Sequence, residues 1–132
     1  MSRENVEIVR RCYEAWNRGD WDGVLAFAHP DIEWHTPRED PDWGSYRGHE
    51  GLRAFWTRWV EAVGRLYFEV EEMIDAGEDV VVITRRRGRG QGSGLEVEDQ
   101  VIQVVTLRDG KGTCVREYYD RKQALEAVRL RE

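Results

Sequence analysis

Apolar residues recur with helical spacing in two stretches of the N-terminal half of the chain. In the first stretch, the apolar residues that share one helix face are Ile8, Val9, Cys12, Ala15 and Trp16. In the second, over residues 49–63, they are Leu52, Phe55, Trp56, Trp59, Val60 and Val63. Between the two, Gly19 is a typical helix stop and Asp20 a typical N-cap. A short helix is therefore expected to begin near Trp21 and to end before Pro30.

The remaining segments alternate apolar and polar residues with the two-residue period of β-strands. An early strand is expected over 31–36, and four more are expected after the second long helix, over Leu66–Asp75, Val80–Arg89, Leu95–Arg108 and Gly112–Tyr119. Asp109-Gly110 is a typical hairpin turn. The polar segments 37–48 and 88–94 are predicted as loops, and the polar tail 121–131 is compatible with a helix. The pattern predicts one α+β domain.

Two of the expected strands are apolar on both of their faces. Val80–Ile83 and Val101–Val105 carry apolar or nearly apolar residues at consecutive positions, which is typical of a sheet that is covered on both sides. The expected helices suffice to cover one face. We therefore expect the other face to join two copies of the chain, giving a homodimer through the sheet.

Composition and charge exclude several classes of protein. The chain has 132 residues, of which 40% are hydrophobic, so it has enough apolar material for one core. A net charge of -6 disfavours nucleic acid and anionic membranes as partners. The apolar runs are too short to span a bilayer and the N-terminus shows no secretory signal, so a cytoplasmic location is expected. Cys12, Cys114 and the three histidines lack the spacing of a metal site, and we expect no metal and no cofactor.

Four segments carry a resemblance to a known family. They are Tyr13–Asp22, Tyr46–Leu52, Leu107–Lys111 and Val115–Asp120, in this order. Together with the order of elements, they resemble the nuclear transport factor 2-like (ketosteroid isomerase-like) superfamily and, within it, the SnoaL-like polyketide cyclase group. The resemblance covers nearly the whole chain and implies a single domain over residues 1–132.

The resemblance also implies a fold and a range of activities. The fold would be a cone-shaped α+β barrel, with N-terminal helices packed in the concave face of a curved, mainly antiparallel sheet. It would enclose a pocket for a small, largely apolar molecule. The superfamily includes isomerases, epoxide hydrolases, dehydratases, cyclases and members without enzymatic activity, so function must be argued from the pocket residues.

This chain lacks the catalytic residues that the isomerases of that superfamily share. In an ungapped alignment from Ile8 to Pro37, the oxyanion-hole Tyr of the isomerases falls on Cys12 and their general-base Asp on Thr36. Their second acid falls near Gln103, outside this ungapped stretch. Neither Cys nor Gln can replace a Tyr and a protonated Asp in stabilising an enolate. A threonine cannot abstract a carbon-bound proton at neutral pH. A steroid-isomerase mechanism is therefore disfavoured.

The epoxide hydrolase pattern fits at two places. The last expected strand puts Glu117 at the second acidic position of that pattern, and Arg85 lies where it has an Arg. Arg87 stands where the pattern has its first Asp, which leaves the water-activating arrangement incomplete.

Strand alternation suggests how these residues could share a site. Arg85 and Arg87 lie on one face of their strand, and Glu117 and Tyr119 lie on one face of theirs. If both faces enter the pocket, two arginines keep Glu117 ionised, as a base or as an acceptor for a substrate hydroxyl. Alternatively, Arg85, Arg87 and Glu117 form a salt-bridge ladder on an outer face, because a shift of one residue reverses every assignment.

The candidate site therefore has two groups of residues. The candidate catalytic residues are Glu117, Arg85 and Arg87. The candidate substrate-binding residues are Trp16, Trp34, Thr36, Tyr46, Trp56, Trp59, Asp99, Gln103 and Tyr119. The tryptophans are equally typical of an apolar core, and His35 alternates away from the face of Trp34.

These observations lead to two hypotheses of function. The first is a cofactor-independent SnoaL-like enzyme that acts by acid–base chemistry on a small hydrophobic molecule, as a cyclase, isomerase, dehydratase or epoxide hydrolase. The second is a non-catalytic ligand-binding or dimerisation domain. In either case Trp43 and Tyr46, aromatic residues in a polar loop, are expected to close over a ligand.

Overall fold

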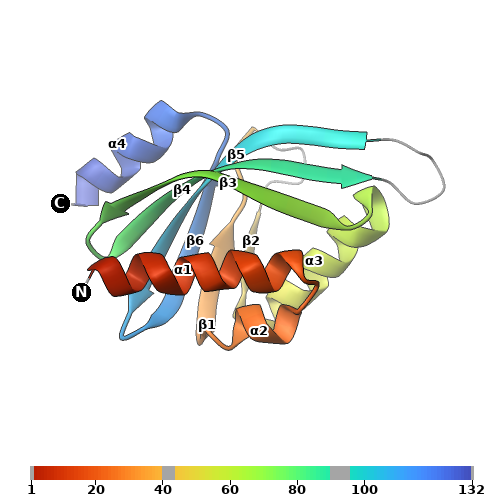
Figure 1. The fold of residues 1–132 in the computed structure, drawn as a ribbon, viewed down its shortest axis with the longest axis horizontal. Coiled ribbons are helices and arrows are strands. Elements are labelled where there is room, and N and C mark those ends of the chain that lie inside the picture. Colours follow the sequence, from red (N-terminus) through yellow and green to blue (C-terminus); the bar gives the residue numbers. More distant parts are fainter. Residues whose placement is uncertain (1, 40–43, 90–95, 132) are drawn as a thin grey trace.

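A computed structural model describes residues 2–39, 44–89 and 96–131 of the chain (Figure 1). Its helices are α1 (Ser2–Asn17), α2 (Trp21–Leu25), α3 (Gly48–Val63) and α4 (Arg121–Arg131). Its strands are β1 (Ala28–His35), β2 (Ser45–Arg47), β3 (Leu66–Ala76), β4 (Asp79–Arg89), β5 (Glu96–Arg108) and β6 (Lys111–Tyr118). Among these described residues, no helix is both long enough and apolar enough to cross a membrane.

The local signals in the sequence account for several element boundaries. Asp20 caps α2, because its carboxylate accepts a hydrogen bond from the backbone N–H of Gly23 at 2.9 Å. Asp109 and Gly110 both adopt positive φ angles, of 53° and 77°, as the tight turn between β5 and β6 requires. The helices and strands expected after residue 48 are confirmed, with boundaries within a few residues.

The sheet is mixed, open and six-stranded, in the order β2-β1-β6-β5-β4-β3. The pairing of β1 with β6 is parallel, and every other neighbouring pair is antiparallel. In Figure 1 the sheet curves behind α1, and α4 lies beyond the opposite end of the strands from α3. The α+β architecture, with N-terminal helices packed in a curved, mainly antiparallel sheet, is confirmed, although the sheet does not close into a complete barrel.

The first edge of the sheet differs from what the sequence pattern predicts. β1 begins at Ala28 and runs through Pro30, which lies where the register between β1 and β6 shifts. A proline is tolerated there because the ladder of hydrogen bonds is irregular at this point, so the backbone N–H that proline lacks is not needed. β2 forms inside the predicted loop 37–48, and its three residues are too few to show an alternating pattern.

Different helices cover the two faces of the sheet. On the inner face, Val80 and Val82 of β4 pack against Val9 and Tyr13 of α1. The outer face is the opposite one, and there Val81 and Ile83 belong to a core cluster with residues of α4, namely Ala124 and Val128. The apolar residues on the second face are therefore covered by the chain's own C-terminal helix, so they do not require a second copy of the chain.

Candidate functional site

A cavity of about 100 Å³ lies between the helices and the inner face of the sheet. Most of its wall is apolar, and much of it is aromatic. The lining residues with aromatic rings are Tyr13, Trp16, Phe27, Trp34, Phe55, Trp56, Trp59 and Phe68. The polar or ionisable side chains in the wall are those of Cys12, Tyr13, Arg86, Gln103 and Glu117, together with the indole N–H groups of the tryptophans.

The aromatic wall is held by ring-to-ring contacts. Trp56 is buried at the centre and meets Trp16 edge to face, with ring centroids 5.0 Å apart, and meets Trp34 in the same way at 6.0 Å. The indole N–H of Trp16 donates to the backbone carbonyl of Leu66 at 2.8 Å, which ties α1 to β3. The four tryptophans that the sequence singled out, Trp59 included, do line the cavity, and their packing gives it a defined shape.

Glu117 is the acidic residue of the cavity wall, and it is only 6% exposed. Its Oε1 accepts a hydrogen bond from the indole Nε1 of Trp34 at 3.0 Å, and its Oε2 accepts one from the amide Nε2 of Gln103 at 2.9 Å. The pairing of β5 with β6 places Gln103 directly opposite Glu117, and the parallel pairing of β1 with β6 brings Trp34 alongside. Three strands therefore position this carboxylate, whose buried charge requires such donors.

Tyr13 of α1 extends the network on the other side of Gln103. Its hydroxyl donates to Oε1 of Gln103, so that the amide joins the tyrosine to Glu117. Burial raises the pKa of the Tyr13 hydroxyl well above its ordinary value, and the negative charge of Glu117 raises it further. Tyr13 is consequently a protonated hydrogen-bond donor at any physiological pH.

Arg86 is the cation of the cavity wall and is 5% exposed. It makes a two-point contact with Asp99, its partner in the β4–β5 register, from Nε to Oδ1 at 3.0 Å and from Nη2 to Oδ2 at 2.7 Å. Its guanidinium also lies 4.9 Å from the ring centroid of Trp59. Burial by itself lowers the pKa of Arg86, but the hydrogen bonds to Asp99 and the charges nearby, Glu117 first among them, raise it overall.

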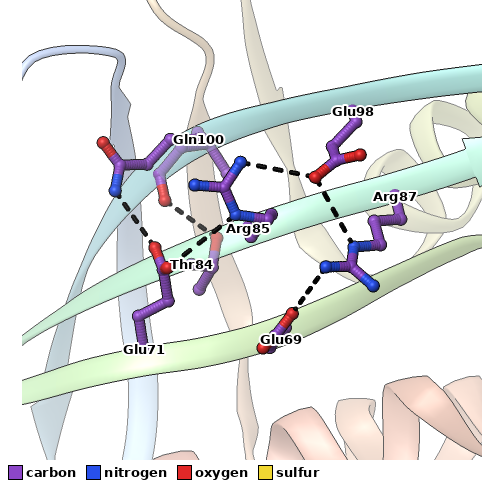
Figure 2. Close-up of polar contacts among 8 residues, drawn as sticks. Glu69, Glu71, Thr84, Arg85, Arg87, Glu98 and Gln100 are labelled. Carbon is purple, nitrogen blue, oxygen red and sulfur yellow. Dashed lines mark hydrogen bonds and ion pairs between the residues drawn. The ribbon is translucent and has the colours of Figure 1, made fainter.

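Arg85 and Arg87 do not line the cavity, which corrects their predicted placement. They project from the outer face of the sheet, where they join an ion-pair network that we call the outer ladder (Figure 2): Glu69, Glu71, Arg85, Arg87, Glu98 and Gln100. Arg87 meets Glu69 at 3.1 Å and Arg85 meets Glu98 at 3.4 Å. The antiparallel register pairs Val82 with Gln103, and this puts the even-numbered residues of β4, Arg86 among them, on the inner face.

The other predicted substrate-binding residues lie around the cavity and are absent from its wall. Thr36 is buried and exchanges hydrogen bonds with the backbone of Gly44, at 2.8 and 3.1 Å. Tyr46 stacks on Phe55, with ring centroids 4.2 Å apart, and so supports the wall from behind. Asp99 acts on the cavity through Arg86, and Tyr119 follows the last residue of β6.

Two further predictions concern the neighbourhood of β2. His35 bonds to Ser45 at 2.7 Å and to Glu33 at 3.2 Å, both on the exposed side of the strand, in keeping with the alternation. The predicted closing role of Trp43 falls outside the described residues, as do the tips of both predicted loops.

The sequence interpretation missed two polar residues of the wall, Tyr13 and Arg86. It had placed Cys12 at a pocket position only through the isomerase alignment. A signal was available for Tyr13, which is four residues after Val9 and three before Trp16, on the same helix face. No such signal existed for Arg86, because three consecutive arginines fit either strand parity.

The wall offers little to a metal ion. Over the described ranges 2–39, 44–89 and 96–131, no three His, Cys, Asp or Glu side chains come together in a way that could hold one. Burial raises the pKa of the Cys12 thiol to about 11, which leaves it protonated and a poor ligand at neutral pH. Chemically, the cavity can enclose a small apolar molecule and present one hydrogen-bonded carboxylate to it.

Comparisons with known proteins agree with this architecture. The model of the SnoaL-like domain family matches residues 9–115. A nuclear transport factor 2-like protein of Burkholderia xenovorans is 34% identical, with 96% of each chain covered and a TM-score of 0.72. TerC, whose crystals contained polyporic acid, is 26% identical over 96% of this chain and 98% of its own, with a TM-score of 0.79. A nuclear transport factor 2-like protein of Burkholderia pseudomallei is also 26% identical, covering 95% and 97%, with a TM-score of 0.79.

Proposed function

The chain belongs to the SnoaL-like domain family, and we propose that it binds a small, largely apolar molecule in its cavity and acts on it by acid–base catalysis without a cofactor. The observation that carries this proposal is the placement of Glu117. It is an acidic group buried in an aromatic wall, with both carboxylate oxygens held by neutral donors. Fixing a carboxylate inside an apolar cavity is costly for the fold, and such arrangements are concentrated at functional sites.

In this proposal Glu117 is the catalytic acid/base. It takes a proton from the bound molecule and returns it to another atom, so that isomerisation, cyclisation or dehydration leaves the protein unchanged. Trp34 and Gln103 hold the carboxylate in one orientation, which reduces the rearrangement needed for proton transfer. The cation of Arg86, held beside the site by Asp99, supplies the positive charge that the sequence interpretation had given to Arg85 and Arg87.

The size and chemistry of the cavity limit the substrate. A volume of about 100 Å³ is of the order that accommodates a single ring, as judged from an engineered cavity of about 150 Å³ that holds benzene. The aromatic wall favours a flat apolar body. That TerC, a relative at 26% identity, was crystallised with polyporic acid supports a ligand of the small organic class.

The proposal is tested by turnover of a small panel of apolar compounds. The panel contains one cyclic enone, one epoxide and one β-hydroxy ketone, each of which reports one reaction type. For any compound that is consumed, Glu117→Gln is expected to lower kcat by about 10²- to 10⁴-fold with little change in KM, because the amide retains the shape but cannot take up the proton. The matched control is Glu98→Gln on the outer ladder, which is expected to leave kcat unchanged.

Two results would count against catalysis by Glu117. Unchanged kcat in Glu117→Gln would remove this residue from the reaction. Tight binding of panel compounds without any turnover by the wild type would favour the alternative hypothesis, a non-catalytic ligand-binding domain.

The homodimer and the cytoplasmic location stay predictions. The apolar half of the outer face is covered by α4, so a homodimer through the sheet would have to use the outer ladder and its surroundings, which include the exposed side chain of Tyr67. The mass of the protein in solution, measured by light scattering, distinguishes one copy from two.

A further inference from the structure

The hydrogen bonds at the polar end of the cavity run in one direction. The amide of Gln103 has a donor end and an acceptor end, and an ionised carboxylate can only accept, so Nε2 must face Glu117. This leaves Oε1 facing Tyr13, whose hydroxyl must then donate its single proton. The negative charge of Glu117 therefore fixes the orientation of the whole sequence of hydrogen bonds.

This direction commits three groups of donors near Glu117 to protein partners, whereas the buried indole N–H of Trp56, also in the wall, has no hydrogen-bond partner among the described residues. The hydroxyl of Tyr13 donates to Gln103, and the indole N–H of Trp34 donates to Glu117. The guanidinium of Arg86 directs Nε and Nη2 to Asp99. A carboxylate has about four acceptor positions and a phenolic oxygen also accepts, so the polar end presents mainly acceptors toward the cavity.

The charges near Glu117 favour the same kind of ligand as the hydrogen bonds do, one that carries a hydrogen-bond donor. Arg86 is a cation of the wall, and its single charge is shared between two carboxylates, those of Asp99 and Glu117. The carboxylate of Glu117 remains the charge that a ligand meets beside Gln103 and Trp34. An anionic group directed at this carboxylate would be repelled, and a carbonyl oxygen directed at it would meet another acceptor, which costs free energy in an apolar cavity.

We infer that the cavity selects a ligand carrying a hydrogen-bond donor, a neutral hydroxyl or an amine, on a single-ring apolar body, with the donor directed at Glu117. This inference rests on the proposed function in taking the cavity as the ligand site, but it does not depend on catalysis. It narrows the ligands that can be directed at Glu117 to phenols, enols, cyclic alcohols and amines, and it disfavours carboxylates.

The test compares three compounds that share a methyl-substituted ring: p-cresol, 4-methylanisole and p-toluate. Their affinities for the wild-type protein are measured at neutral pH by titration in protein-observed NMR. We expect p-cresol to bind about 10- to 100-fold more tightly than 4-methylanisole, because only p-cresol donates to the buried carboxylate. p-Toluate is expected to bind most weakly of the three.

The variant Glu117→Gln removes the charge while keeping the shape, and it provides a neutral amide that both donates and accepts. In this variant the advantage of p-cresol over 4-methylanisole is expected to fall to within about threefold. The control Glu98→Gln, on the outer ladder, is expected to keep the wild-type preference.

The outcomes separate this inference from the proposed function. If 4-methylanisole or p-toluate binds wild type as tightly as p-cresol, or if Glu117→Gln keeps the full preference, the inferred selectivity is wrong while the cavity remains a ligand site. If none of the three compounds binds up to its solubility limit, both the selectivity and the proposed site are overturned. Loss of the preference in Glu117→Gln without loss of turnover would contradict only the catalytic proposal.

Discussion

Arg86 and its two neighbours on β4 show how differently one residue type can behave on the two faces of one sheet. Arg86 lies on the inner face, where it is 5% exposed and makes a two-point contact with Asp99 beneath the ring of Trp59. Arg85 and Arg87 lie on the outer face, where their side chains are 37% and 57% exposed and join the outer ladder (Figure 2). The guanidinium group of Arg86 therefore lines the cavity, whereas those of Arg85 and Arg87 lie on a solvated surface.

The difference shows that burial, more than residue type, decides what a charged side chain contributes. A buried ion pair must compensate for the loss of water around both charges, so removing one partner leaves the other at a high cost. An exposed pair gains little, because water already solvates each charge and salt screens the attraction. The inner face is therefore sensitive to single changes in a way that the outer ladder is not.

The largest effect is expected from Arg86→Met. This change keeps most of the side-chain volume but removes the cation shared by the buried Glu117 and by Asp99, whose side chain is 35% exposed, and it is expected to lower the free energy of unfolding by about 1.5–3 kcal/mol. Chemical denaturation measures the change. The matched control is Arg85→Met, one residue away, for which a loss of about 1 kcal/mol or less is expected.

A double variant sharpens the comparison further. In Arg86→Met with Asp99→Leu, one of the two carboxylates that have lost the cation is also removed, so part of the stability is expected to return while Glu117 stays uncompensated. Equal losses in Arg86→Met and Arg85→Met would contradict the difference between the two faces.

An intermediate effect is expected at Cys12, whose thiol lines the cavity and has a pKa raised by burial to about 11, from an ordinary value of 9.0. Because the thiolate is the reactive form, the rate of alkylation is expected to rise about tenfold per pH unit from pH 7 to about 11. A freely exposed thiol would level off near pH 9. The measurement uses iodoacetamide and mass spectrometry on a Cys114→Ser variant, which leaves a single thiol.

The same shift has a consequence for stability and for ligand binding. The folded protein holds the Cys12 proton more tightly than the unfolded chain does, so this group favours folding below pH 9, and its contribution is lost as the pH rises toward 11.

A ligand in the cavity is expected to slow alkylation of Cys12. A rate that levels off near pH 9, or that saturating p-cresol leaves unchanged, would place Cys12 outside the ligand site.

The smallest effect is expected in the outer ladder. Arg87→Gln removes the contact with Glu69 at 3.1 Å, between two side chains that are more than half exposed. The expected loss is below about 1 kcal/mol, and it is expected to vanish in 1 M salt, where the screening length falls to about 3 Å. Denaturation curves at low and high salt measure it, and a loss that persists in high salt would mean that the ladder is shielded from solvent.

Much of the fold could be predicted from the sequence because its helices and turns carry strong local signals. The spacing of Leu52, Phe55 and Trp56 marked the buried face of α3, and Asp109-Gly110 marked the last hairpin. β2 could not be predicted, because three residues are too short for a period and its position depends on pairing with β1.

The candidate site was predictable in part. The sequence named both Gln103 and Glu117 as candidate pocket residues, and the structure brings them within hydrogen-bond distance. The parity of β4 was not predictable, because Val81 and Ile83 on the outer face are as apolar as Val80 and Val82 on the inner one. Val81 and Ile83 are covered by α4, and the sequence of β4 contains no feature that predicts this contact.

The most direct test of the account is to observe both faces of the sheet while p-cresol is added. In ¹⁵N-resolved NMR spectra, the indole N–H of Trp34 and the side-chain amide of Gln103 report on the carboxylate of Glu117, and the Nε–H groups of Arg85 and Arg87 report on the outer ladder. The account predicts that the first pair of signals shifts in a saturable way while the second pair stays in place. Shifts confined to the arginines of the outer ladder, or a saturable p-cresol complex that leaves Trp34 and Gln103 unchanged, would contradict it.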